Sequence, residues 1–405
     1  MVLFHGWIVV AATHVALFVV FGVGYSFAAF FTAFQEEFNA SRGEVALVFS
    51  IFGLLYFLVG AITGIIADRV GPRRVCIAGM LLLCLALIAT SRATTIEHLY
   101  IAYSVGIGLA VGFVYVPSVS AVQPWFVRKR GLATGLTVAG IGLGTLLGPV
   151  IGAWLITIFG WRHTYELFAV VGLVLGVGAA FFIDNAPARR GLFPDDEKQD
   201  SGRASPRQVP LGLTLRQAVR TRAFWLIYAA LLACGIGLFV PMVHLAPYAQ
   251  DHGLSGETGA LLTGLIGLGS MIGRFGLAGI GDRLPRATLL GLLFMGMGVA
   301  LLLWLMSSGV LPLAIFAVLF GTCYGGMVAV APAIVMDYFG ARSVAGIIGI
   351  VYTGPGIGVG IGPWLAGVSY DLYGSYTLPI VASIAFMVLA IGAATLLTRE
   401  QTLHV

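Results

Sequence analysis

A single cation, Arg274, lies in the middle of the apolar, glycine-rich stretch from Leu265 to Leu284. If this stretch is a membrane-spanning helix that ends at Asp282, a rise of about 1.5 Å per residue puts Arg274 roughly 12 Å deep, near the midplane. An arginine there costs about 2.5 to 3.5 kcal/mol, and no acidic residue is expected at that depth. The sequence therefore predicts that Arg274 binds an anionic ligand. The alternative is a guanidinium capped by backbone carbonyls.

Three tyrosines fall at a similar depth when residues are counted from the basic inner ends of their helices: Tyr115, Tyr324 and Tyr352. A phenol hydroxyl donates and accepts hydrogen bonds, and its ring forms an apolar wall. We expect these side chains to orient a carboxylate beside Arg274. The alternative is that each tyrosine only packs between helices.

Two histidines, His14 and His244, lie well inside expected helices. An intramembrane group that titrates near neutral pH is a candidate for proton coupling. His244, towards the outer side, is also expected to help bind the anion. The alternative is that each is a neutral imidazole with a structural hydrogen bond.

Two Asp-Arg pairs end apolar runs at the expected inner boundary: Asp68 with Arg69, and Asp282 with Arg283. An aspartate there can bind an arginine or a helix N-terminus, so the pairs predict a gating motif. The alternative is that the arginines only fix orientation. The sequence has no catalytic constellation and no metal-ligand spacing, so we expect no enzyme activity, metal or cofactor.

The amino-acid composition indicates whether the helices that carry these residues lie in water or in a lipid bilayer. The chain has 405 residues, of which 59% are hydrophobic and 10% charged, and its mean hydropathy is +1.00. Soluble domains carry about 25% charged residues. Apolar runs of about 20 residues, long enough to span a bilayer as helices, recur twelve times. The sequence predicts an all-α membrane protein with twelve transmembrane helices in two six-helix bundles.

A polar stretch divides the chain into two halves that resemble each other. We expect residues 1–184 and 223–405 to form the bundles and residues 185–222 to form a cytoplasmic linker. A shift of 214 residues lays Asp68 on Asp282 and Gly148 on Gly362. A duplicated unit of this kind suits a carrier that works by alternating access.

The basic residues predict the orientation of the chain. They gather in alternate loops and at the C-terminal end, so both termini are expected in the cytoplasm of a multi-pass protein of the plasma or inner membrane. The net charge of +5 then reflects topology and contact with anionic lipids of the bilayer, not nucleic-acid binding.

Two motifs resemble a known family. The segment GIIADRVGPRR, Gly64 to Arg74, is similar to the loop motif of the major facilitator superfamily. The segment WFVRKRGLATGLTVAG, Trp125 to Gly140, resembles the Y-F-x-[KR]-R-R-x-L-A-x-G-x-A-x-A-G signature of monocarboxylate transporters. The resemblance implies the fold of that superfamily and transport of a monocarboxylate or related organic anion. It includes the bacterial branch with oxalate and formate exchangers.

The resemblance also implies residues that this chain lacks. Animal members have an aspartate four residues before the corresponding arginine and a lysine in the first helix. Here Ser270 takes the first position, and the first helix has no lysine. We expect proton-coupled symport of a small monocarboxylate such as lactate or pyruvate. The alternatives are an organic anion antiporter of the oxalate and formate kind and, from another class, a membrane receptor that transports nothing.

Overall fold

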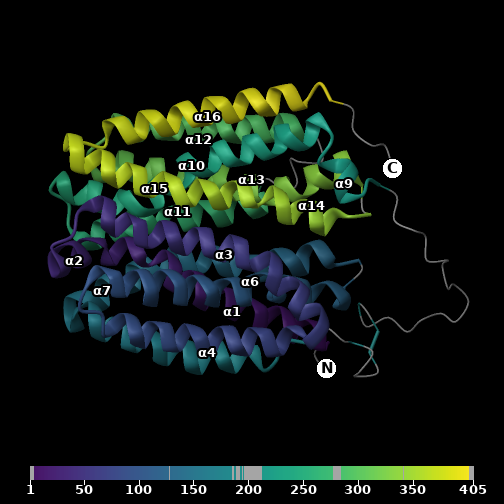
Figure 1. Ribbon diagram of the computed structural model, residues 1–405, viewed down its shortest axis with the longest axis horizontal. Coiled ribbons are helices and arrows are strands. Elements are labelled where there is room, and N and C mark those ends of the chain that lie inside the picture. Colours follow the sequence, from purple (N-terminus) through teal and green to yellow (C-terminus); the bar gives the residue numbers. More distant parts are fainter. Residues whose placement is uncertain are drawn as a thin grey trace, which may run out of the picture.

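The structure is a computed structural model, and it describes residues 4–126, 128–184, 187, 192–193, 195, 212–276, 284–340 and 342–400, with the backbone alone at Ala61, Asp68, Arg130 and Ala345. Within these ranges the chain is helical, apart from turns and an isolated bridge between Gly212 and Gly340. Long helices run side by side along the molecule (Figure 1).

The helices of the N-terminal half are α1 (His5–Tyr25), α2 (Phe27–Phe38), α3 (Arg42–Val70), α4 (Pro72–Ser91), α5 (Ile96–Leu99), η1 (Tyr100–Ile107), α6 (Gly108–Val122), η2 (Gln123–Trp125), α7 (Arg130–Val171), η3 (Gly172–Val177) and α8 (Gly178–Ala180). Those of the C-terminal half are α9 (Leu215–Ala218), α10 (Arg222–Asp251), α11 (Gly256–Gly276), α12 (Arg286–Leu305), α13 (Val310–Phe339), α14 (Val344–Val351), α15 (Thr353–Tyr373) and α16 (Thr377–Leu397).

Eleven helical stretches of the described chain are long and apolar enough to cross a membrane. One of them, Gly131–Ala180, has 50 residues. A straight helix of that length would be about 75 Å long, more than twice the hydrocarbon core of a bilayer. The backbone turns at Gly160, whose φ of 75° lies in the left-handed region that favours glycine. This stretch therefore makes two spans, and the described residues contain the expected twelve.

The long helices pack as two groups. In the first, α1 packs on α7 and α6, α3 packs on α6, and α4 packs on α6 and α7. In the second, α10 packs on α15 and α16, α12 packs on α13 and α16, and α11 packs on α13. The expected limits of the bundles at residues 184 and 223 stay a proposal, because most of the linker lies outside the described residues.

Equivalent glycines bring helices together in both halves. A Cβ added to Gly148 of α7 would lie 2.2 Å from the carbonyl oxygen of Gly22 in α1. A Cβ added to Gly362 of α15 would lie 2.1 Å from the carbonyl oxygen of Ile236 in α10. Both members of the second pair follow their counterparts by 214 residues, the offset of the sequence repeat. The duplicated halves therefore share the backbone contact that only glycine permits.

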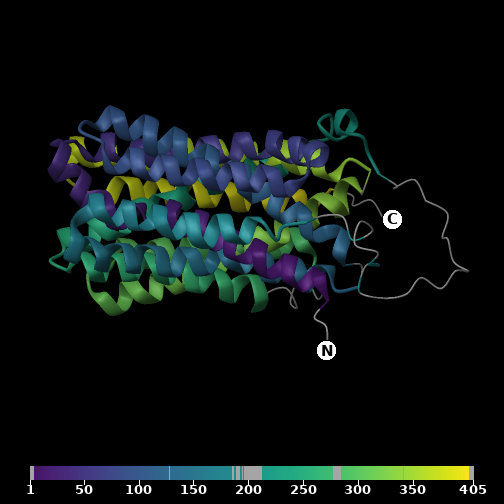
Figure 2. The same ribbon diagram turned by 90° about the horizontal axis from the view of Figure 1, so that it is seen from below.

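The two groups of helices also contact each other. α1 begins and α16 ends at the end that carries α9 and α14, which we call the inner end; the opposite end is the outer end (Figures 1 and 2). Contacts of α3 with α15 run from Arg42 beside Gly367 at the outer end to Phe57 beside Gly356, halfway along α3. These contacts therefore join the two groups in the outer half of α3. α7 and α11 also join them, with contacts that run toward the inner end as far as Gly135 beside Phe275.

Candidate functional site

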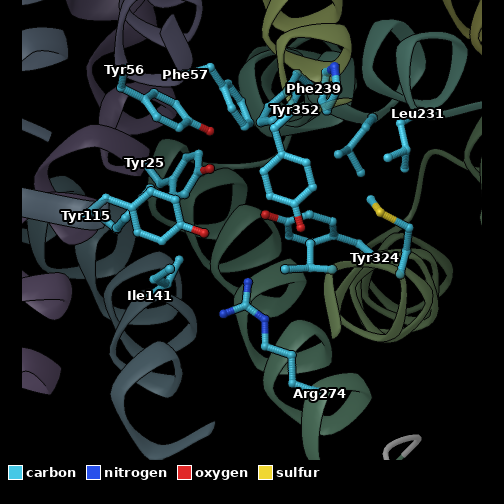
Figure 3. Close-up of a pocket in the computed structure, with 15 residues that line it drawn as sticks. Tyr25, Tyr56, Phe57, Tyr115, Ile141, Leu231, Phe239, Arg274, Tyr324 and Tyr352 are labelled. Carbon is cyan, nitrogen blue, oxygen red and sulfur yellow. The ribbon is translucent and has the colours of Figure 1, made fainter. Parts of the chain in front are cut away.

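A cavity lies between the two groups of helices, at the level where the contacts of α3 with α15 end (Figure 3). The empty space within it is about 590 Å³, including the part that is open to solvent. The cavity is lined by Phe21, Tyr25, Tyr56, Phe57, Tyr115, Ile141, Leu231, Leu238, Phe239, Arg274, Tyr324, Met327, Val328, Tyr352 and Pro355.

Arg274 reaches this cavity from α11. The preceding residue, Gly273, faces α13, where an added Cβ would lie 2.0 Å from the carbonyl oxygen of Thr322. Since successive residues of a helix are turned by about 100°, the side chain of Arg274 points away from that interface (Figure 3). The guanidinium therefore stands at one end of the cavity.

The guanidinium has few partners in the described part of the chain. Its NH1 group donates one hydrogen bond of 2.9 Å to the carbonyl oxygen of Val138 in α7. Its buried Nε has no hydrogen-bond partner there, and the ring of Tyr324 lies 6.0 Å from its central carbon. Carbonyl capping thus accounts for one of its donors and leaves others for a ligand.

The three tyrosines singled out by their depth all line the cavity. Tyr115 comes from α6, Tyr324 from α13, and Tyr352 lies between α14 and α15. In Figure 3 the hydroxyl groups of Tyr115 and Tyr352 point into the space in front of Arg274. The structure therefore brings these residues together with Arg274, while their part in binding stays a proposal.

Two further tyrosines, Tyr25 and Tyr56, line the cavity but were not expected from the sequence. Tyr25 is the last residue of α1, and Tyr56 lies midway along α3. Their hydroxyl groups point into the same space as that of Tyr115 (Figure 3). Tyr56 precedes Asp68 by twelve residues, so counting from the inner boundary would have found it.

The lining carries one charge. Among the fifteen described residues that line the cavity, Arg274 is the only one with an ionised side chain, and five phenol hydroxyls accompany it. No group of His, Cys, Asp or Glu side chains that could hold a metal occurs in the described ranges. The site is therefore positively charged, and its chemistry is suited to hold one anion by charge-assisted hydrogen bonds.

His244 lies outside the cavity lining. It is fully buried in α10, with Nδ1 3.0 Å from the hydroxyl oxygen of Tyr376 and Nε2 2.8 Å from the carbonyl oxygen of Pro363. Its ring meets the ring of Phe31 edge to face. The structure therefore does not bring His244 to Arg274, as the sequence had suggested, but sets it in a network nearer the outer end.

His14 is also separate from the cavity lining. Its Nδ1 lies 2.7 Å from the carbonyl oxygen of Leu136, so the ring links α1 to α7 inside the N-terminal half. This hydrogen bond is the structural alternative that the sequence left open for His14.

The gating motif cannot be followed in the structure. Asp282 and Arg283 lie outside the described residues, and Asp68 is described by its backbone alone. Arg69 is exposed in the last turn of α3. The gating role of these four residues stays a proposal.

Comparison with known proteins now identifies the chain. The sequence model of the family described as the Major Facilitator Superfamily matches residues 13–309 and 235–404 of this chain. The chain therefore belongs to this superfamily and is a membrane transporter, not an enzyme. Monocarboxylate transporter 13 of Rattus norvegicus is 27% identical over 96% of this chain and 87% of its own length. Monocarboxylate transporter 3 of the same species is 30% identical over 92% and 76%. Within the superfamily the chain is a member of the monocarboxylate transporter family.

Two more comparisons agree with this assignment. Monocarboxylate transporter 2 of Homo sapiens is 27% identical over 95% of this chain and 84% of its own length. Among solved structures, a bacterial homologue of the human lysosomal transporter Spinster superposes with a TM-score of 0.76 and covers 98% of both chains at 15% identity. That similarity concerns the fold alone.

Proposed function

We propose that the protein is a secondary active carrier of small monocarboxylates of the lactate and pyruvate type, and that the carboxylate binds Arg274. The observation that carries this proposal is the buried Nε of Arg274, which has no partner within the described chain, in a cavity with no other ionised side chain. A buried charge without a partner is strongly unfavourable. A bound carboxylate supplies that partner.

The chemistry of the guanidinium favours a monoanion. It is planar, stays charged at physiological pH and binds both oxygens of one carboxylate. One bound carboxylate makes the site close to neutral, which lowers the cost of closing water out of it. A dianion such as oxalate would leave a negative charge without a second cation, so the oxalate and formate antiporter is the second candidate. The similarity to several monocarboxylate transporters supports the same substrate class.

We further propose proton-coupled symport by alternating access of the two bundles. The cavity lies between the bundles, so each can expose it in turn to one side of the membrane. Uptake of one proton with one monoanion makes the transported complex electroneutral. His244 and His14 are the proton candidates within the helices. The proposed location is the plasma or inner membrane, with both termini cytoplasmic.

The experiment is counterflow in proteoliposomes that contain the purified protein, with labelled lactate and a panel of C1 to C5 mono- and dicarboxylates. We expect exchange of the small monocarboxylates and its loss in Arg274→Ala. Arg92→Ala is the matched control, because the side chain of Arg92 is 75% exposed and pairs only with Glu166 in the described structure. Normal lactate exchange by a folded Arg274→Ala protein would contradict the proposal. A preference for oxalate would favour the organic anion antiporter. If no acid were exchanged at all, the result would favour the membrane receptor.

A further inference from the structure

A cluster at the outer end joins the two bundles through Arg42, the first residue of α3. Its guanidinium holds Asp251 of α10 with two hydrogen bonds, 2.6 Å from NH2 and 2.7 Å from NH1. It also stacks on the ring of Tyr370, with its central carbon 3.8 Å from the ring centre. The side chains of this ion pair are only 13% and 27% exposed, so the pair is shielded from water more than an ordinary surface pair.

The same end of α3 binds a second carboxylate from the other bundle. The backbone N–H groups of Arg42 and Gly43 donate to the two carboxylate oxygens of Asp371, over 2.9 and 2.7 Å. These groups belong to the first turn of α3, which has no intrahelical partners for them, and the helix dipole favours an anion there. Asp251 and Asp371 together therefore tie the start of α3 to the C-terminal half.

His244 is connected to this cluster by a chain of hydrogen bonds. NH1 of Arg42 donates to the hydroxyl oxygen of Tyr376 over 2.8 Å, and that oxygen lies 3.0 Å from Nδ1 of His244. Because the carbonyl oxygen of Pro363 can only accept, Nε2 of His244 donates to it. Nδ1 of the neutral ring must then accept from Tyr376. The order of donors is fixed along the whole chain.

We propose that Arg42, Asp251, Asp371, Tyr376 and His244 form the outer gate of the carrier, and that proton binding at His244 opens it. This inference rests on the alternating access of the proposed function. For the outer end to open, the bonds of Arg42 to α10 and α15 must break. A proton on Nδ1 reverses the bond to Tyr376, so that the phenol oxygen faces two cationic donors. The imidazolium then repels Arg42, which weakens the closed gate.

The groups around His244 agree with this direction. From α3 it faces Arg42, from α15 Asp371, and from the start of α16 Tyr376, whose ring packs on the ring of Tyr370. Its own helix contributes Tyr248 and Asp251, and α2 contributes the uncharged Phe31. In the closed gate Asp251 and Asp371 are occupied by Arg42 and by the N-terminus of α3. Burial of the ring and the charge of Arg42 oppose an imidazolium in the closed gate, while Asp371 favours it. Because opening the gate brings water to the ring and moves Arg42 away, acidification favours the open gate.

The test measures the outer end without any substrate. Spin labels on cysteines at His163 and Ser308, both exposed at the outer end on different bundles, report the distance across the gate in a protein whose four native cysteines are replaced by alanine. At neutral pH we expect Asp251→Asn and Arg42→Gln each to produce a second population of molecules in which the two spin labels are farther apart than in the parent. The double variant should resemble the single ones, because both remove the same ion pair.

Glu37→Gln is the matched control. Its partner is Arg162, also 2.6 Å away and at the outer end, but both residues belong to the N-terminal half. We expect no change in the distance. The assignment of these residues to an outer gate is wrong if Asp251→Asn and Arg42→Gln leave the distance between the labels as it is in the parent. It is also wrong if Glu37→Gln changes that distance equally.

The proton step has its own variant. Glutamine at position 244 can donate to Pro363 and accept from Tyr376 without titrating. On acidification from pH 7.5 to pH 5 the parent should gain the longer distance, whereas His244→Gln should not. An equal response in both proteins would overturn the assignment of the proton to His244. Since no carboxylate is present, failure here leaves binding at Arg274 untouched, and failure of Arg274→Ala to impair exchange leaves the gate untouched.

Discussion

Arg274 and a lysine at the same position would carry the same charge but different donors. Lysine lacks the planar fork that holds both carboxylate oxygens, and its pKa falls readily when it is desolvated. We therefore expect Arg274→Lys to retain at most weak lactate uptake in proteoliposomes. Uptake at the parent rate would mean that charge alone suffices, and would remove the argument from bidentate binding.

The hydroxyl group of Tyr115 contributes one orienting hydrogen bond in the proposed site. A bond of this kind is worth about 0.5 to 1.5 kcal/mol, so Tyr115→Phe should raise the half-saturation concentration for lactate roughly 2- to 10-fold. Tyr165→Phe is the matched control, because the Tyr165 hydroxyl is buried away from the cavity and has no partner in the described structure. Equal effects of the two variants would show that Tyr115 acts through packing.

At the level of single residues, depth was a better guide than chemical type. Counting from the inner ends of the helices led to Arg274 and to three of the five cavity tyrosines, because membrane depth is nearly linear along a helix. It could not tell which way a side chain points. His244 has a suitable type and lies inside a helix, but it faces Tyr376 and Pro363 instead of the cavity. The direction of the His244 side chain depends on how α10 packs against α15. This packing cannot be predicted from the sequence of one helix alone.

Helix packing at the glycine contacts gives a prediction for α7. A methyl group at position 148 would meet the backbone of α1, which cannot move aside as a side chain can. Gly148→Ala should therefore lower the free energy of unfolding by about 1 to 3 kcal/mol, seen as a lower midpoint of thermal unfolding in detergent.

Gly392→Ala in α16 is the control for that variant. No atom lies within 4 Å of a Cβ added there, and alanine is the better helix former by up to about 1 kcal/mol. Its midpoint should equal or exceed that of the parent. A Gly148→Ala protein as stable as the parent would mean that α1 and α7 can separate without loss.

The lengths of the apolar runs predicted the number of membrane-spanning helices. The breaks within those helices are visible only in the structure. The run from residue 131 to 183 reads as two spans in the sequence, and the structure joins them through the single non-helical residue Gly160. In the first span, α1 ends at Tyr25 and α2 begins at Phe27, although the apolar run continues without a break. Hydropathy indicates which residues lie in the membrane, but it does not indicate where the backbone changes direction.

The orientation of the whole molecule is tested from outside the cell. We expect a cysteine at Ser201, in the proposed linker, to resist an impermeant thiol reagent in intact cells and to react after lysis. A cysteine at His163, at the outer end, should react in both. The native cysteines are buried or half-buried in helices, so they are replaced by alanine to remove background. Labelling of position 201 in intact cells would reverse the orientation.

At the outer end, each described connection between successive spans is at most four residues long, and the one in α7 is the single residue Gly160. A protease needs an extended segment of several residues to bind its substrate, and an antibody needs a protruding surface. These connections offer neither, since they turn at once into the next helix. If the outer end faces the surroundings of the cell, the carrier presents little there that foreign enzymes can cut or binding proteins can grasp.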